Sequence, residues 1–294
     1  MVYFCADDYG VSEYSNNRIE YCLKNGLLNK VSVLPNGEIT DFKQRLSGEG
    51  VTLSLHLNLI EGFSMSAPKE VPLLVTVSGQ FRYSFIKLFL LSLSPLKRQQ
   101  LEKQIYSELQ KQIKFWVASM GKDTPIFIDS HQHTHMIPLV FKVLMKVIED
   151  EKVNVEYIRI PSEPVLPYIF TPSLYFSYSI KGFLKQWVLK VLSLINTSRL
   201  KKSNIQYSYF MGAMFSGRLN EKKIKKLLPR YLKLADKHKR HVEIGFHPGY
   251  LQNAETLIDG VRDGFKKFYF SPWRKTEFDT LINLTLKDNN ERRI

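Results

Sequence analysis

The 294-residue sequence predicts an α/β fold, and more narrowly a single (β/α) barrel with extensions over residues 1–294. Short apolar segments alternate with helical ones along the chain, which is typical of βα units around a mainly parallel sheet. Two of the expected strands bring a histidine, His56 or His247, to or near their C-terminal end. Because the active sites of such barrels gather at that end of the strands, the two histidines favour the barrel.

Hydrophobic periodicity and capping residues place the main elements. The expected strands are Val2–Ala6, Lys30–Leu34, Val51–Leu59, Pro125–Asp129, Val155–Ile160, Tyr207–Gly212 and His241–His247. The expected helices include Glu13–Asn25, ended by Gly26, a long one from about Leu96 to Met120, ended by Gly121, and two that begin at Pro138 and near Glu221. Proline favours the first helical position, and glycine is common just past a helix end.

Polar and apolar residues alternate along Val51–Leu59, with Thr52, Ser54, His56 and Asn58 on one face. Such alternation is the usual pattern of a surface strand in an antiparallel sheet, with its polar face in water. In a barrel it indicates instead that the leucines pack on helices and the polar groups face a central site.

Composition limits the class of protein. Hydrophobic residues make up 44% of the chain and aromatic residues 13%, which is ample for a large core. Cys5 and Cys22 belong to no CxxC pair, so free thiols in a reducing compartment, the cytoplasm, are expected. Met1 leads directly into an apolar strand, so a signal peptide is not expected, and no apolar run reaches the length of a membrane span.

The formal net charge of +14 indicates either a solvated basic surface or an anionic partner. The basic residues are scattered over helices, and no RNA- or DNA-recognition motif accompanies them, so a nucleic-acid partner is not expected. An anionic substrate and contact with an anionic membrane surface stay open.

Two adjacent carboxylates, Asp7 and Asp8, end the first strand. Neighbouring strand residues point to opposite faces, so one carboxylate would bind a metal while the other works as a base. A plain turn explains the pair about equally well, because Asp and Gly favour turns. By itself, His56 late in its strand is more typical of a structural histidine than of a metal ligand.

Three histidines at alternate positions, His131, His133 and His135, follow a buried strand and precede a helix. Packing hardly explains such a cluster, and neutral imidazole is the commonest metal ligand. One or two of the three are therefore expected as direct ligands. Asp129, two residues before His131, would orient a ligating imidazole.

His247 and Arg159 lie near the ends of two further strands. His247 precedes a Pro-Gly turn, where it is either a capping residue or a general acid. Arg159 would orient a carboxylate or bind substrate, unless it makes surface contacts only. One carboxylate and two imidazoles, with a further carboxylate and imidazole nearby, match metal-assisted hydrolysis. The sequence has no GxSxG elbow, Cys/His nucleophile signature, Walker loop or GxGxxG, which removes the main competing chemistries.

With these motifs the sequence resembles the YdjC-like carbohydrate deacetylases, whose best-known members are chitooligosaccharide deacetylases. The resemblance rests on ADDYG (6–10), LHLNLIEG (55–62), DSHQHTH (129–135), RIP (159–161) and HPGY (247–250), with a weaker match at RKTEF (274–278). Order and rough spacing agree over nearly the whole chain. Tyr9 and Ile60 stand where the family more often has Phe and Thr, and neither position is a ligand.

The resemblance implies a distorted (β/α) TIM-like barrel, a divalent metal such as magnesium or zinc, and removal of an acetyl group from an N-acetylated carbohydrate. It implies that Asp8, His56 and His131 bind the metal. Asp7 resembles the catalytic base, and His247 the histidine that protonates the leaving amine. Around them, Asp129, His133, His135 and Arg159 are expected to orient the ligands or contact the substrate.

The expected partner is an N-acetylated sugar or oligosaccharide. A lipid-linked sugar, peripheral contact with a membrane and a homodimer are left open. Two alternatives to this function remain: a metal-dependent hydrolase of another amide or an ester, and a non-catalytic basic binding protein. Stoichiometric metal together with acetate release would separate the first function from the last.

Residues 164–220 match no motif and are expected to form a basic, partly helical insertion within the domain. They contain no Asp or Glu, and their cations include Lys181, Lys185, Lys190, Arg199, Lys201 and Lys202. Apolar residues recur at i, i+3 and i+4 between Ile180 and Leu192, the stripe of an amphipathic helix. Such a helix either packs on the barrel with its lysines in water or rests on an anionic membrane surface.

Overall fold

The computed structural model describes residues 1–37, 39–201 and 203–285, so Lys202 lies outside the described residues. Within these ranges, seven parallel strands form one sheet in the order β5-β4-β3-β2-β1-β7-β6. The strands are β1 (Val2–Tyr9), β2 (Lys30–Val33), β3 (Thr52–Leu57), β4 (Ile126–Ser130), β5 (Val155–Ile158), β6 (Tyr209–Met211) and β7 (Val242–Phe246).

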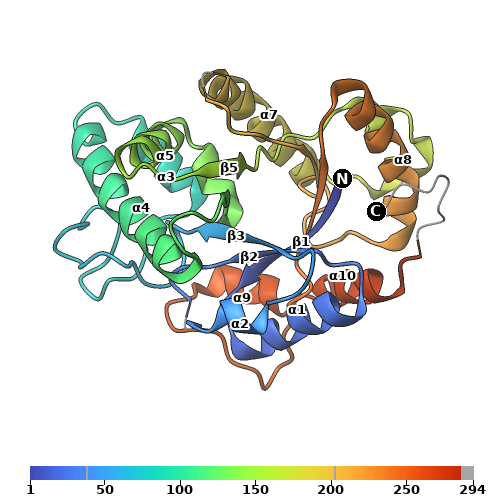
Figure 1. The fold of residues 1–294 in the computed structure, drawn as a ribbon, viewed down its shortest axis with the longest axis horizontal. Coiled ribbons are helices and arrows are strands. Elements are labelled where there is room, and N and C mark those ends of the chain that lie inside the picture. The colour runs from blue at the N-terminus through green and yellow to red at the C-terminus, as the bar shows by residue number, and fades with distance from the viewer. Residues whose placement is uncertain (38, 202, 286–294) are drawn as a thin grey trace.

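Helices surround the sheet (Figure 1), with α1 against β1, α4 against β3 and α8 against β7. No helix in the described part of the chain has the length and apolar character needed to span a membrane. The helices are α1 (Glu13–Asn25), α2 (Phe42–Arg45), α3 (Phe85–Ser92), α4 (Arg98–Met120), α5 (Pro138–Asp150), α6 (Leu166–Ile169), α7 (Ile180–Leu200), α8 (Glu221–His238), α9 (Asp263–Tyr269) and α10 (Pro272–Asn283), with 3₁₀ turns η1 (His131–Met136) and η2 (Pro172–Ser177).

The sheet curls until its two edges touch. Gln206, just before β6, accepts a hydrogen bond from the Ile158 amide at 3.0 Å and donates one to the Glu156 carbonyl at 2.8 Å, both on β5. The α/β class and a curled parallel sheet are therefore confirmed. The described part of the chain forms seven strands where a TIM barrel has eight, and within it this one bridge joins the edges of the sheet.

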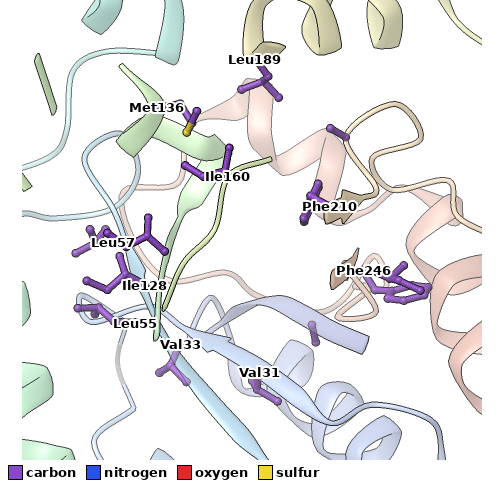
Figure 2. Close-up of a cluster of buried hydrophobic side chains, with 14 of the residues drawn as sticks. Val31, Val33, Leu55, Leu57, Ile128, Met136, Ile160, Leu189, Phe210 and Phe246 are labelled. Carbon is purple, nitrogen blue, oxygen red and sulfur yellow. The ribbon is translucent and has the colours of Figure 1, made fainter. Parts of the chain in front are cut away.

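The two faces of the sheet differ sharply in polarity. Val31 and Val33 of β2, Leu55 and Leu57 of β3 and Ile128 of β4 belong to the hydrophobic core, as Figure 2 shows. The opposite face is polar: it carries Lys30, Ser32, Ser54, His56, Asp129 and Glu243, all buried. The alternation in Val51–Leu59 thus reflects a buried polar interior, and the alternative of a water-exposed antiparallel strand is wrong.

The predicted elements agree with the structure to within three residues at their ends. Local signals explain this agreement for α1, because the Ser12 hydroxyl accepts a hydrogen bond from the Ser15 amide at 3.1 Å and Gly26 ends the helix. Within residues 164–220, β6 pairs with β7 and belongs to the sheet, as the expected strand at Tyr207–Gly212 implies. The described elements α6, η2 and α7 of this range stand outside the sheet, and its assignment as an insertion stays a prediction.

Candidate metal centre and catalytic cavity

The predicted site residues meet at the carboxyl ends of the strands, in a cavity of about 630 Å³. Asp7 and Asp8 come from β1, His56 from β3, His131 from the turn after β4, and His247 from the residue after β7. Five side chains from four distant segments of the chain therefore line one cavity. This is the edge at which α/β barrels carry their active sites.

Asp8, His56 and His131 form the centre of the cavity floor. The Oδ1 atom of Asp8 lies 2.9 Å from Nδ1 of His131 and 3.6 Å from Nε2 of His56. One ligand atom from each residue lies within 4.8 Å of the other two, so one cation can contact all three. All three side chains are buried. A carboxylate with two imidazoles is a common ligand set for a catalytic metal.

Each imidazole is held by a further carboxylate on its other nitrogen. Nδ1 of His56 lies 2.6 Å from Oδ1 of Asp129, and Nε2 of His131 lies 3.0 Å from Oε2 of Glu61. Such partners fix the tautomer and orientation of metal-binding histidines. Asp129 was expected to orient His131, its neighbour in sequence. The register of β3 and β4 places it opposite His56 instead, and Glu61, which we did not predict, serves His131.

The residues present fit a metal ion. Nε2 of His56 is buried and has no hydrogen-bond partner among the described residues, as expected of a nitrogen whose partner is a cation. Among the residues that the structure describes, two other clusters of acidic, histidine or cysteine side chains are close enough to be considered, and both include Asp129. That carboxylate already accepts hydrogen bonds from Ser32 at 2.7 Å and Ser54 at 2.8 Å. The centre built on Asp8 therefore fits a cation best.

Charge balance in the centre is set by close contacts. Burial raises the pKa of Asp8, but His131, His56 and Arg274 outweigh it and hold that pKa well below its usual range. Burial lowers the pKa of His131, whereas the carboxylates of Asp8 and Glu61 raise it, with a net result of about 10. The imidazole therefore carries a proton at neutral pH, and a bound cation must displace it. Metal affinity is expected to increase with pH.

Asp7 and Asp8 both line the cavity although they are neighbours in a strand. Regular alternation predicted opposite directions. The backbone of Asp8 has a φ of 70°, in the left-handed region, and the pairing of β1 with β2 shifts register between Ala6 and Tyr9. An irregularity of this kind redirects side chains at the end of a strand. It brings two consecutive carboxylates to one side.

Arg159 holds Asp7 in place. Its Nη1 and Nη2 atoms lie 2.7 and 2.9 Å from the two carboxylate oxygens of Asp7. Burial raises the pKa of Asp7, but the nearby Arg159 and then His56 outweigh burial and lower it. The net pKa lies below its ordinary value, so the group is a carboxylate at neutral pH. Arg159 is fully buried, also contacts Glu243, and is not among the residues that line the cavity. In this position it orients carboxylates from behind the cavity lining.

Helix α10 supports the site from outside the sheet. Arg274 contacts Asp8 and donates a hydrogen bond to the Gly249 carbonyl at 2.9 Å. Glu277 accepts one from the His247 amide at 2.6 Å, and its carboxylate lies 3.6 Å from Nδ1 of His247. Both residues belong to the RKTEF segment, whose match to the family was the only signal for them.

The remaining histidines of the cluster diverge. Gln132 and His133 have φ values of 51° and 58°, and this kink turns His133 into the cavity wall. His135 turns away from the cavity. Nδ1 of its ring lies 2.5 Å from the Ser130 hydroxyl, and Nε2 donates a hydrogen bond to the Arg159 carbonyl at 2.7 Å. His133 is thus a candidate for substrate contact, whereas His135 links the turn to Arg159, directly after β5.

Helices α7 and α3 form part of the cavity wall. Lys181, Leu184 and Lys185 of α7 line it together with Ile86 of α3. Burial lowers the pKa of Lys185, which lies within reach of the Asp7 charge. The cavity therefore combines a charged floor with walls that are largely apolar and carry two lysines.

Replacing Glu61 by Gln is expected to weaken metal binding roughly 10- to 100-fold, because the amide holds the His131 ring less firmly than a carboxylate does. Competition with a chromophoric chelator measures the affinity. Glu70→Gln, at a partly exposed carboxylate in the same connection between β3 and α3, is the matched control and should bind metal normally. Equal affinities in both variants would show that Glu61 does not support the centre.

The stability of the protein should fall below pH 6.5 through His135. Burial lowers the pKa of His135 from 6.5 to about 4. The folded state therefore resists protonation, and the stabilisation is complete above pH 6.5 and is lost as the pH falls toward 4. Between pH 7 and about pH 4.5 the loss is about 2 kcal/mol. Chemical denaturation of the wild type and His135→Gln at both pH values measures it, and an identical pH dependence in the two proteins would contradict it.

Comparison with known proteins identifies the family of this chain. The family model described as YdjC-like protein matches residues 1–291. Two relatives named carbohydrate deacetylase, from Xenopus laevis and Danio rerio, are each 30% identical, over 159 and 172 residues. The aligned parts cover 53% and 57% of this chain and 49% and 52% of the relatives, so the chain spans about half the length of the curated relatives it matches.

A solved structure from Enterococcus faecalis V583 has a similar fold. It carries the provisional description of a cellobiose-phosphate cleavage protein. The TM-score is 0.58, the alignment covers 96% of this chain and 90% of that one, and the sequence identity is 16%. At this identity the likeness concerns the fold alone.

Proposed function

We propose that this chain, which belongs to the YdjC-like family, is a metal-dependent hydrolase that removes the acetyl group from an N-acetylated carbohydrate. The observation that carries the proposal is the convergence of Asp8, His56 and His131 beside Asp7 in one cavity. The family match confirms the resemblance found in the sequence. The relatives named carbohydrate deacetylase support the reaction and the class of substrate.

A divalent cation held by Asp8, His56 and His131 would supply Lewis acidity, which polarises an acetamide carbonyl and lowers the pKa of water. Asp129 and Glu61 orient the two imidazoles for this purpose. Two nitrogen ligands out of three favour zinc or a similar transition metal over magnesium, which prefers oxygen ligands.

Asp7 is the proposed general base. Its carboxylate lines the cavity next to the centre, and Arg159 binds both of its oxygens. The lowered pKa of Asp7 keeps a proton acceptor available from mildly acidic pH upward. Asp7 would take one proton from the attacking water as the new C–O bond forms at the acetyl carbon.

His247 is the proposed general acid. Its ring lies in the wall of the same cavity, and Glu277 approaches Nδ1, which leaves Nε2 for the substrate. His247 would donate a proton to the sugar nitrogen as the C–N bond breaks, so that acetate and a free amine are the products. Replacing His247 by a residue without an imidazole should therefore slow hydrolysis most for substrates whose leaving amine is strongly basic.

Acetate release from a panel of acetylated sugars tests the function. The panel contains N-acetylated oligosaccharides, the same sugars O-acetylated, and a simple N-acetylated amine, with zinc or magnesium added back to chelated protein. We expect acetate and free amine in equal amounts from the N-acetylated sugars. Acetate from the esters alone, or from the simple amide alone, would assign the chain to another class of hydrolase.

We propose a reducing compartment, the cytoplasm, for this chain. Cys5 and Cys22 are both free and buried, on β1 and α1 respectively. Burial raises the pKa of Cys22 to about 12, so its thiol stays protonated and unreactive. Thiol trapping during cell lysis should find both cysteines reduced, and a disulfide recovered from intact cells would exclude this location.

A further inference from the structure

Helix α7 exposes large apolar side chains, although Leu189, Leu192 and Leu200 on its other face are buried in the core. Exposed fractions reach 81% for Ile180, 61% for Phe183, 61% for Trp187 and 67% for Leu194. A helix on the surface of a globular protein normally turns such residues toward the core. Contiguous exposed patches of this kind mark a surface that binds a partner.

The opposite face of α7 is fixed to the body of the protein by polar contacts. Gln186 donates a hydrogen bond to the Glu163 carbonyl at 3.1 Å, and Asn196 donates one to the Met136 carbonyl at 2.8 Å. Gly182 lies so close to the Met214 carbonyl that a Cβ atom would stand 2.5 Å from its oxygen. Rolling α7 to bury its apolar face would break these contacts. The outward direction of the apolar residues is therefore built into the fold.

Two neighbouring elements extend the apolar area. Ile86 and Leu90 of α3 and Leu93, its C-terminal cap, are 67%, 59% and 54% exposed, and Phe176 of η2 is fully exposed. Ile86 lines the catalytic cavity together with Leu184 of α7, so both helices border the same cavity. We call the exposed apolar residues of α3, η2 and α7 the rim surface (Figure 1 shows the positions of α3 and α7).

A second hollow, of about 290 Å³, opens beside the rim surface. It lies between α6, η2 and α7, and its walls are mainly aromatic and aliphatic: Tyr168, Tyr175, Tyr178, Phe183, Trp187 and Met214. The size and apolar lining suit a segment of hydrocarbon chain. Lys190 stands at its border.

Charge selects among the partners that an apolar surface could bind. Residues 164–220 contain no acidic residue, and Lys181 and Lys190 are exposed on α7. A second copy of this chain would place the same cations opposite each other, which is unfavourable. Apolar and aromatic side chains interleaved with lysines match the interface of an anionic bilayer, where aromatic rings enter the headgroup region and lysines contact phosphate.

We infer that the rim surface docks on an anionic membrane and presents the catalytic cavity to an acetylated sugar carried by a lipid. The evidence for docking comes from the rim surface alone, whereas the identity of the substrate as an acetylated sugar rests on the proposed function. Each cation near an anionic leaflet strengthens binding roughly fivefold, so a few lysines with inserted aromatic rings give reversible attachment.

Co-sedimentation with vesicles tests the docking. Full-length protein is mixed with phosphatidylcholine vesicles, with or without phosphatidylglycerol, at low and raised salt. The variant Phe176→Ser, Phe183→Ser, Trp187→Ser removes three exposed rings that do not line the catalytic cavity. Its control removes exposed side chains elsewhere: Tyr14→Ser, Tyr21→Ser, Val77→Ser.

We expect binding to anionic vesicles that weakens with salt, with roughly tenfold or greater loss in the rim variant and none in the control. Lys190→Glu should weaken binding further than Lys233→Glu, which changes an exposed lysine on α8. Acetate release from a water-soluble sugar should be equal in the rim variant and wild type, which shows that the variant is folded. Equal binding to neutral and anionic vesicles, or equal binding by rim and control variants, would overturn the inference whether or not the chain is a deacetylase.

Discussion

Replacing His131 by Ala is expected to abolish stoichiometric metal binding and to reduce acetate release roughly 10³-fold or more, because Lewis-acid catalysis contributes several kcal/mol to the rate. His131 lies between Asp8 and Glu61, at 2.9 and 3.0 Å. Its removal leaves two buried carboxylates without the imidazole between them. His56→Ala should behave alike, since Nε2 of His56 faces the same point. Metal content after dialysis and initial rates measure both effects.

His135→Gln is the matched control for these variants. It changes a buried histidine of the same turn whose ring contacts Ser130 and the Arg159 carbonyl and does not line the cavity. At neutral pH it should keep one equivalent of metal and most of the activity. A His131→Ala protein that retained metal and turnover would show that the ligands are assigned wrongly.

Replacing Asp7 by Asn is expected to leave metal binding unchanged while turnover falls roughly 10²- to 10⁴-fold, because a general base is lost and the ligands remain. Asp8→Asn should lower the metal affinity as well as the rate. The two residues differ in their partners: Asp7 is paired with Arg159, whereas Asp8 faces His131 and His56. Isothermal titration with metal and single-substrate kinetics separate the two outcomes.

The comparison between the two asparagine variants is decisive because the substitutions are chemically identical at adjacent positions. Equal metal affinity in both would remove the division between base and ligand. Loss of metal from the Asp7→Asn variant alone would show that Asp7 is the metal ligand and Asp8 the base. Thermal unfolding of each variant shows whether the lost charge has altered the fold.

Much of the fold could be predicted because its signals are local. Alternation in Val51–Leu59, the glycine at 26 and the proline at 138 each depend on a few neighbouring residues. The positions of the histidines at the strand ends could likewise be predicted from the sequence. Parallel strands bring their carboxyl ends to one edge, so His56, His131 and His247 could be expected together before any coordinates.

What the sequence did not show depends on contacts between distant segments. Glu61 supports His131 from 70 residues away, and Arg274 reaches Asp8 across 266 residues. The turn of Asp8 toward the same side as Asp7 comes from a shift in strand pairing, which alternation cannot predict. Periodicity identified α7 as amphipathic, but only its polar anchors Gln186 and Asn196 show that the apolar face points outward.

The most direct test of the account is a metal titration of chelated protein with acetate release from an N-acetylated oligosaccharide as the readout. We predict that chelated protein is inactive, that the rate of acetate release rises linearly with added zinc, and that it reaches a plateau at one equivalent of zinc per chain. The His131→Ala protein should show no such rise. Full acetate release by protein shown to hold no divalent metal would contradict the account.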